Sequence, residues 1–152
     1  MKKLLYLIIP CLVASCGAKK ETPEKNAILG TTTNWVSSSN DYAPFFDINS
    51  YSEHAEYGIS EKYPVFVGGF KEKVGPTNQR RYLASLAGPQ GEEIQFTRRG
   101  SCCPYSSENG YEGVGLLDVY EVWYEGLEEP ILIYISFYDK EPLYIPHGFT
   151  KK

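Results

Sequence analysis

The chain has 152 residues, a formal net charge of −4 and an aromatic content of 14%. Its 42% of hydrophobic and 22% of charged residues are typical of a globular protein and argue against an intrinsically disordered chain. The length suffices for one domain and is too short for a (β/α)8 barrel, which needs about 250 residues. Because 15 basic side chains face 19 acidic ones, the composition gives no indication of a nucleic-acid-binding surface.

The N-terminus has the layout of a bacterial export signal. Two lysines precede an apolar stretch at residues 4–13, which is shorter than the roughly 20 residues of a membrane-spanning helix. The sequence VASC at residues 13–16 resembles a lipobox, in which the cysteine is acylated and becomes the mature N-terminus. We therefore expect residues 1–15 to be a lipoprotein signal peptide and Cys16 to carry lipid. The alternative is an ordinary secretory signal in which this cysteine occurs by chance.

Removal of the signal would leave 13 basic and 19 acidic side chains, a formal charge of −6. Anchoring must then come from acyl chains, because a domain of this charge does not attract anionic lipids. The residue after the cysteine is Gly17 rather than Asp, which by resemblance to lipoprotein sorting favours the outer membrane, with the domain facing the periplasm or the exterior. Residues 16–40 are polar and are expected to form a tether to a single domain at residues 41–152.

Hydrophobic patterning predicts a small α+β domain with a mainly antiparallel sheet. Residues 64–67 are rich in β-forming side chains, and residues 75–87 predict one short helix with a proline in its first turn. Residues 93–98 alternate as a strand, and we expect a tight turn at residues 100–104.

The strongest pattern is a C-terminal hairpin. Residues 117–124 and 131–138 alternate in polarity on either side of a short turn, as two antiparallel strands do. We expect Ile131, Ile133 and Ile135 to share a buried face.

Two neighbouring cysteines form the least ordinary segment. Because Cys11 leaves with the signal and Cys16 carries lipid, Cys102 and Cys103 have only each other as intramolecular partners. Export favours a disulfide, whereas adjacent Cα atoms are only ~3.8 Å apart, less than the usual disulfide span of ~4.4–6.8 Å. A reduced pair and a vicinal disulfide both remain open. The two preceding arginines would favour a reactive thiolate, but the spacing is not that of Cys-X-X-Cys redox proteins.

Two sets of side chains are candidate binding surfaces. Four arginines could hold a phosphate or a carboxylate, although arginines at the surface more often pair with acids: Arg80, Arg81, Arg98 and Arg99. Tyrosine accounts for 13 of the 152 residues, and four tyrosines of the hairpin could form an aromatic face for sugars or peptides: Tyr120, Tyr124, Tyr134 and Tyr138. The alternative for the tyrosines is cross-strand packing under the helix.

The sequence carries no recognisable catalytic, metal or cofactor motif. His54 and His147 each lack a second histidine at ligand spacing. There is also no phosphate loop, nucleophile elbow or dinucleotide fingerprint. We therefore expect no catalytic residue, no metal and no cofactor.

Several stretches carry a resemblance: GPTNQRRYL at 75–83, GPQGE at 88–92, RGSCCPY at 99–105, GLLDVYEV at 115–122 and PHGF at 146–149. In these the chain resembles a family of small lipoproteins from Gram-negative bacteria that have no established activity. The resemblance covers residues 56–151 and identifies a family rather than a chemistry. Some members carry the name 2-dehydro-3-deoxyphosphooctonate aldolase, whereas enzymes with that activity resemble phosphate-binding barrels far longer than this chain.

Two classes of function follow. The first is a non-catalytic, lipid-anchored module of the cell envelope that binds an envelope protein or a glycan or has a structural role. The second is an enzyme, with thiol-redox chemistry at Cys102 and Cys103 or the aldolase activity that the family name implies. The lack of a base, a metal set or a redox spacing around any nucleophile favours the first class.

Overall fold

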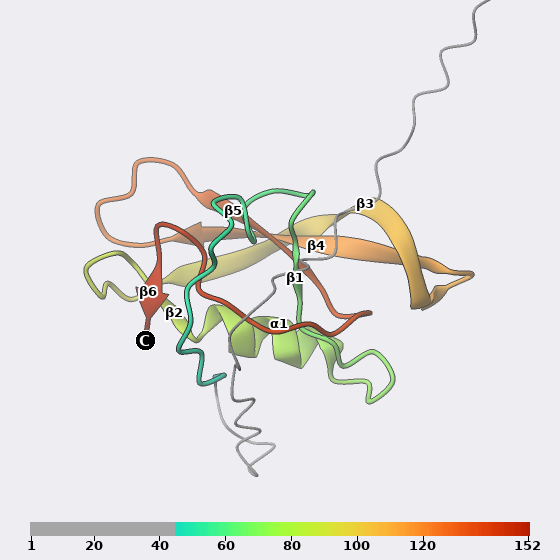
Figure 1. The fold of residues 1–152 in the computed structure, drawn as a ribbon. Helices are drawn as coiled ribbons and strands as arrows, with labels where there is room; N and C mark the ends of the chain where they lie inside the picture. Colours follow the sequence, from blue (N-terminus) through green and yellow to red (C-terminus); the bar gives the residue numbers. More distant parts are fainter. Residues whose placement is uncertain (1–44) are drawn as a thin grey trace, which may run out of the picture.

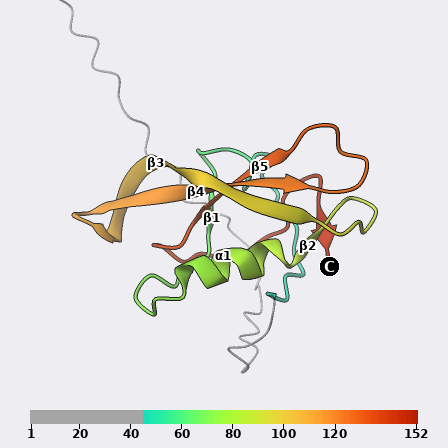
Figure 2. The same ribbon diagram turned by 180° about the vertical axis from the view of Figure 1, so that it is seen from behind.

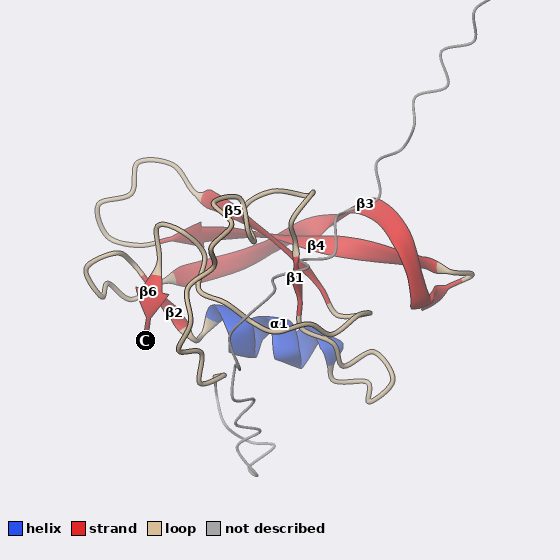
Figure 3. Ribbon diagram, in the orientation of Figure 1, coloured by secondary structure: helices blue, strands red, loops and turns tan. Residues whose placement is uncertain are grey.

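A four-stranded open sheet and one helix form the two layers of the fold in the computed structural model, which describes residues 45–152 (Figures 1 and 3). The helix lies against one face of the sheet, and the view from behind shows the same two layers (Figure 2). The predicted signal peptide, the lipidation site at Cys16 and the tether lie outside the described residues.

The strand order of the main sheet is β1 (Val65–Phe66), β5 (Ile131–Ser136), β4 (Val114–Trp123) and β3 (Gln95–Tyr111). Both long pairings are antiparallel, and only β1 runs parallel to its neighbour β5. A second, two-stranded sheet joins β2 (Leu86–Ala87) to β6 (Thr150–Lys151). The prediction of an α+β fold with a mainly antiparallel sheet is confirmed at this level.

The helix is shorter than the sequence pattern predicted. It spans Gly75–Leu83 (α1) and has Pro76 in its first turn, as expected. Residues 86–87, which we placed in the helix, instead form β2, because their backbone pairs with the C-terminal residues of the chain. The amide of Lys152 also donates to the carbonyl of Ser85 (2.9 Å), so the C-terminus determines where the helix ends.

The predicted turn at residues 100–104 is wrong. Strand β3 continues through this stretch, and its pairing with β4 shifts twice, between Arg98 and Gly100 and between Cys102 and Tyr105. Each shift is a β-bulge in which β3 has one residue more than β4. A bulge accommodates an extra residue without ending the strand. After the bulge, each side chain points to the opposite face from the one it would have in a regular strand.

The predicted hairpin of β4 and β5 is present, with Ile133 and Ile135 in the core and Ile131 partly buried against it. Ile133 and Ile135 are both 0% exposed. They lie on the sheet face that α1 covers, where they pack with helix residues such as Tyr82 and Leu83. A smaller cluster lies on the opposite face and consists of Phe66, Tyr105, Leu117, Cys102, Cys103 and Tyr134.

The buried face of the hairpin gives a stability prediction. We expect Ile133→Ala to lower the free energy of unfolding by about 2–5 kcal/mol, because it leaves a cavity where the core is fully buried. Urea denaturation measures this change. Leu132→Ala, at a half-buried position on the other face, is the matched control and should cost clearly less. A loss within ~0.5 kcal/mol for Ile133→Ala would contradict the assignment of the two faces.

Candidate functional site

A pocket of about 500 Å³ lies between α1 and the sheet. Its lining comes from the first two turns of the helix, from β3 and β4, and from the two residues that follow β5. This volume is within the range of ~300–1,000 Å³ that is usual for sites of small molecules. The pocket is therefore large enough for a monosaccharide or a ligand of similar size.

The polar centre of the pocket is the carboxylate of Asp118, which is only 6% exposed. Its Oδ1 accepts hydrogen bonds from Arg98 Nη2 (2.7 Å) and from the hydroxyl of Ser101 (2.7 Å). Its Oδ2 accepts a hydrogen bond from Gln79 Nε2 (2.8 Å). Three donors from two different elements, α1 and β3, thus hold one charged group of β4.

The first β-bulge makes this arrangement possible. Arg98 and Ser101 are three residues apart, so in a regular strand their side chains would point to opposite faces. The bulge between them adds one residue, and Arg98 pairs with Tyr120 while Ser101 pairs with Asp118. Since Tyr120 and Asp118 share a face of β4, Arg98 and Ser101 also share that face and reach the same carboxylate.

Gln79 connects the helix to two residues of β4. Its side chain is 1% exposed, and its Oε1 accepts a hydrogen bond from the hydroxyl of Tyr120 (3.0 Å). Because its amide donates to Asp118 at the same time, both ends of the amide are fixed. Burial raises the pKa of Tyr120, so this hydroxyl keeps its proton at neutral pH and remains a donor. The hydrogen bond to Asp118 raises the pKa of Arg98, which remains a cation.

Aromatic rings form the apolar wall of the pocket. Phe137 and Tyr138 stack with ring centroids 4.7 Å apart, and the exposed Phe70 lies against Tyr138 at 4.9 Å. Gly75 makes room for this stack, because a Cβ atom there would lie 2.5 Å from the ring of Phe137. The glycine at the helix start therefore positions an aromatic wall next to the polar centre.

The four arginines do not form one anion site, which corrects the prediction. Arg80 and Arg98 both line the pocket. Arg81 lies over the ring of Phe46, with its guanidinium carbon 4.6 Å from the ring centroid. Arg99 is on the other side of β3 and is 3.8 Å from a carboxylate oxygen of Glu121. Neighbouring residues in a helix or strand point in different directions, so only the first arginine of each pair enters the pocket.

The four tyrosines do not form one exposed row either. Tyr120 is 4% exposed and shares the helix-covered face with Ile133, its partner across the hairpin. Tyr134 is paired with Val119 on the opposite face, because β4 and β5 are in a register that separates the two tyrosines. Tyr124 packs on Phe149 in the main core, and Tyr138 lines the pocket. Of the predicted row, only Tyr120 and Tyr138 meet at the site.

Sequence reasoning missed Gln79, Ser101 and Asp118, the centre of the pocket. One signal was present in the pattern. Asp118 alternates with Tyr120 and Val122, so it occupies a core-facing position of β4, where an unpaired carboxylate is costly. Such a position indicates a bound cation or a set of donors.

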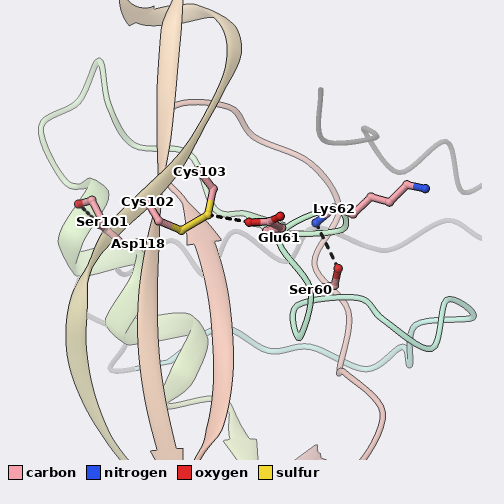
Figure 4. The surroundings of a disulfide bond; sticks show 7 residues. All are labelled: Ser60, Glu61, Lys62, Ser101, Cys102, Cys103 and Asp118. Atoms are coloured by element: carbon pink, nitrogen blue, oxygen red, sulfur yellow. Dashed lines mark hydrogen bonds between the residues drawn. A yellow bond between two sulfur atoms is a disulfide. The ribbon is translucent and has the colours of Figure 1, made fainter. Parts of the chain in front are cut away.

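The two adjacent cysteines are joined by a disulfide on the opposite face of the sheet. Their Cα atoms are 3.7 Å apart, and Cys103 has a positive φ of 54° at the second β-bulge. Figure 4 shows the disulfide on the side of the sheet away from Ser101, next to Glu61. Together with residues such as Arg99, Leu132 and Tyr134, the cysteines line a second pocket of about 430 Å³.

The surroundings of the disulfide oppose a thiolate at Cys103. The Sγ atom of Cys103 lies 3.0 Å from Glu61 Oε2. A carboxylate at this distance disfavours a second negative charge on the sulfur. Redox-active cysteines, in contrast, usually lie next to groups that stabilise a thiolate. Arg99, which lines the same pocket as the cysteines, is already close to Glu121.

Both histidines make contacts that stabilise loops. The ring of His54 lies 3.6 Å from that of Tyr63, and His147 Nε2 is 3.0 Å from the carbonyl oxygen of Ser52. Within residues 45–152, no three His, Cys, Asp or Glu side chains are grouped so that they could hold a metal ion.

Comparison with known proteins returns no match to a family model, a curated protein or a solved structure. The described part of the chain has no helix that is long and apolar enough to cross a membrane. The resemblance to small lipoproteins therefore stays a prediction based on the quoted stretches alone.

The polar centre of the pocket gives a second stability prediction. We expect Asp118→Ala to destabilise the domain by about 1–3 kcal/mol, because it leaves the buried amide of Gln79 without its main acceptor. Asp118→Asn keeps one carbonyl oxygen as an acceptor and should cost less. Thermal unfolding followed by circular dichroism compares the two. Equal stability of both variants and the wild type would show that the network contributes nothing to the fold.

The disulfide gives a prediction about covalent state. We expect the isolated protein to resist alkylation under denaturing conditions at Cys102 and Cys103 until a reductant is added. Intact-mass spectrometry counts the alkyl groups with and without the reductant. Two thiols that react without it, in protein isolated anaerobically, would contradict the disulfide.

Proposed function

We propose that this chain is a lipid-anchored protein of the bacterial outer membrane whose domain binds a glycan of the envelope without chemically changing it. The pocket between α1 and the sheet is the proposed binding site. The observation that carries the proposal is that stacked aromatic rings and a fixed polar centre line the same pocket.

Both sides of the pocket suit a sugar ring. The C–H groups of a pyranose pack well on flat aromatic side chains such as those of Phe137 and Tyr138. Its hydroxyls need donors and acceptors at fixed positions, which the network around Asp118 supplies. A protein partner, in contrast, would need a contact surface of about 800 Å² per partner rather than a concave pocket of this size.

The state of Asp118 favours binding over catalysis. A general base or a nucleophile must direct a free lone pair at its substrate. Asp118 is only 6% exposed, and three of the roughly four lone-pair sites of its carboxylate already accept hydrogen bonds from Gln79, Arg98 and Ser101. The carboxylate therefore orients its donors, and the exposed Arg98 and Ser101 rather than Asp118 itself are positioned to meet a ligand.

The sequence supports the envelope as the location. The lipobox-like VASC at residues 13–16 and the glycine after Cys16 are the features that favour a lipid anchor in the outer membrane. Through this anchor the membrane would be a permanent partner. The acidic charge of the mature chain favours neither anionic lipid nor nucleic acid as a further partner.

A thiol-redox enzyme is the second candidate, because the disulfide lines a pocket of its own. The carboxylate of Glu61 next to Cys103 argues against it, since exchange reactions proceed through a thiolate. The aldolase of the family name has no support in residues 45–152, which form an open sheet with one helix rather than a barrel.

Glycan binding is tested with the exported, unlipidated Cys16→Ala chain. We expect calorimetric titration with a panel of hexoses and hexuronates to detect binding of at least one sugar. Tyr138→Ala should weaken it at least about tenfold, because the substitution removes one stacking ring of the wall. Tyr134→Ala, on the opposite face, is the matched control and should bind normally. Equal losses in both variants, or no binding of any sugar, would contradict the proposal.

The anchor is tested in whole cells. We expect Cys16→Ala to abolish labelling with a radioactive fatty acid and to release the protein from the membrane fraction, because the domain has no electrostatic substitute for acyl chains. Cys11→Ala, which removes a cysteine within the apolar stretch of the signal, should leave both labelling and membrane association unchanged. Membrane retention of the Cys16→Ala variant would contradict the lipid anchor.

A further inference from the structure

The distribution of arginine in this chain is uneven. All four arginines of the chain lie in two adjacent pairs, at 80–81 and 98–99. The pairs come from α1 and β3, and the first member of each lines the pocket between these elements. Arg81 and Arg99 lie elsewhere, over Phe46 and beside Glu121.

The pocket differs in charge from the domain around it. Residues 45–152 contain 10 basic and 16 acidic side chains, a net charge of −6. The pocket lining reverses this balance, with Arg80 and Arg98 against one carboxylate, that of Asp118. Arg98 and Asp118 compensate each other at 2.7 Å. The remaining charge is that of Arg80.

Arg80 is available to a ligand. It is exposed, and the one hydrogen bond of its side chain among residues 45–152 is a long contact of Nη2 with the hydroxyl of Thr77 (3.4 Å). No carboxylate of the described chain lies within ion-pair distance of it. Arg80 and Arg98 line the same pocket, together with the hydroxyl-bearing Tyr120.

We propose that the ligand of this pocket is an acidic sugar, a hexuronate or a glycan that contains one, and that Arg80 binds its carboxylate. This proposal rests on the proposed function and names the substrate class of the same site. A planar guanidinium matches a carboxylate with two parallel hydrogen bonds, which a neutral sugar cannot use in the same way. The stacked rings of Phe137 and Tyr138 would then hold the apolar face of the sugar.

Two pairs of sugars test this directly: galacturonate against galactose, and glucuronate against glucose. Within each pair the ring is the same and only C6 differs, as a carboxylate or a hydroxymethyl group. We expect calorimetry of the Cys16→Ala chain at low salt to show at least about tenfold tighter binding of one hexuronate than of its neutral partner. Added salt should reduce this preference, because Arg80 is exposed to solvent.

The variants separate the role of Arg80 from that of the pocket. Arg80→Gln should remove the preference, so that the hexuronate and its neutral partner bind with about equal affinity. Arg81→Gln is the matched control. The guanidinium of Arg81 lies over Phe46 and does not line the pocket. This variant should retain the full preference.

Each of the following results would overturn one part of the proposal. If a neutral sugar binds as tightly as its hexuronate, the acidic ligand is wrong while the sugar site stands. If the preference survives in Arg80→Gln, Arg80 is not the residue that binds the carboxylate. If none of the four sugars binds but acetate does, the pocket is a simple anion site and the proposed glycan function fails with the inference. If neither the sugars nor acetate bind, both fail.

Discussion

Burial of the carboxylate of Asp118 is the constraint on which the site depends. A charge removed from water must be compensated by donors at short distance, or the fold loses several kcal/mol. Here the donors are Gln79, from α1, and Arg98 and Ser101, from β3. The carboxylate of β4 thus joins the helix to the sheet, and the same contacts orient the polar side chains of the pocket.

Two local departures from regular structure make this possible. The bulge after Arg98 turns Ser101 to the helix-covered face, and the bulge after Cys102 contains the left-handed Cys103. Between them, one stretch of β3 presents polar side chains to the pocket and a disulfide to the opposite face (Figure 4). A glycine at position 75 leaves space for Phe137. Pocket shape and polarity therefore follow from backbone irregularities as much as from the side chains.

Patterns with a local cause were predictable from the sequence. Alternation along the hairpin identified Ile133 and Ile135 as core, and the Gly-Pro dipeptide at position 75 identified the start of the helix. Features that depend on partners distant in the sequence were not predictable. The helix ends early because residues 86–87 pair with a strand more than 60 residues away.

The same limit applies to the candidate site. A glycine and a proline around the cysteines are compatible with a turn or with a bulge, and the pairing with β4 decides between them. Which arginine of each pair enters the pocket depends on how α1 is rotated about its axis. It also depends on the sheet face to which each side chain of β3 points. A single aromatic row would need Tyr120 and Tyr134 on one face, whereas their positions in the register place them on opposite faces.

The pocket between α1 and the sheet is the proposed ligand site. The most direct test is NMR spectroscopy of the ¹⁵N-labelled Cys16→Ala chain during titration with galacturonate and glucuronate. We expect shifts of the backbone amides of Gln79, Arg98 and Tyr138 and of the side-chain Nε–H of Arg80, and unchanged signals at Leu132 and Tyr134. Shifts confined to Leu132 and Tyr134, beside the disulfide, would contradict the claim and assign binding to the other face of the sheet.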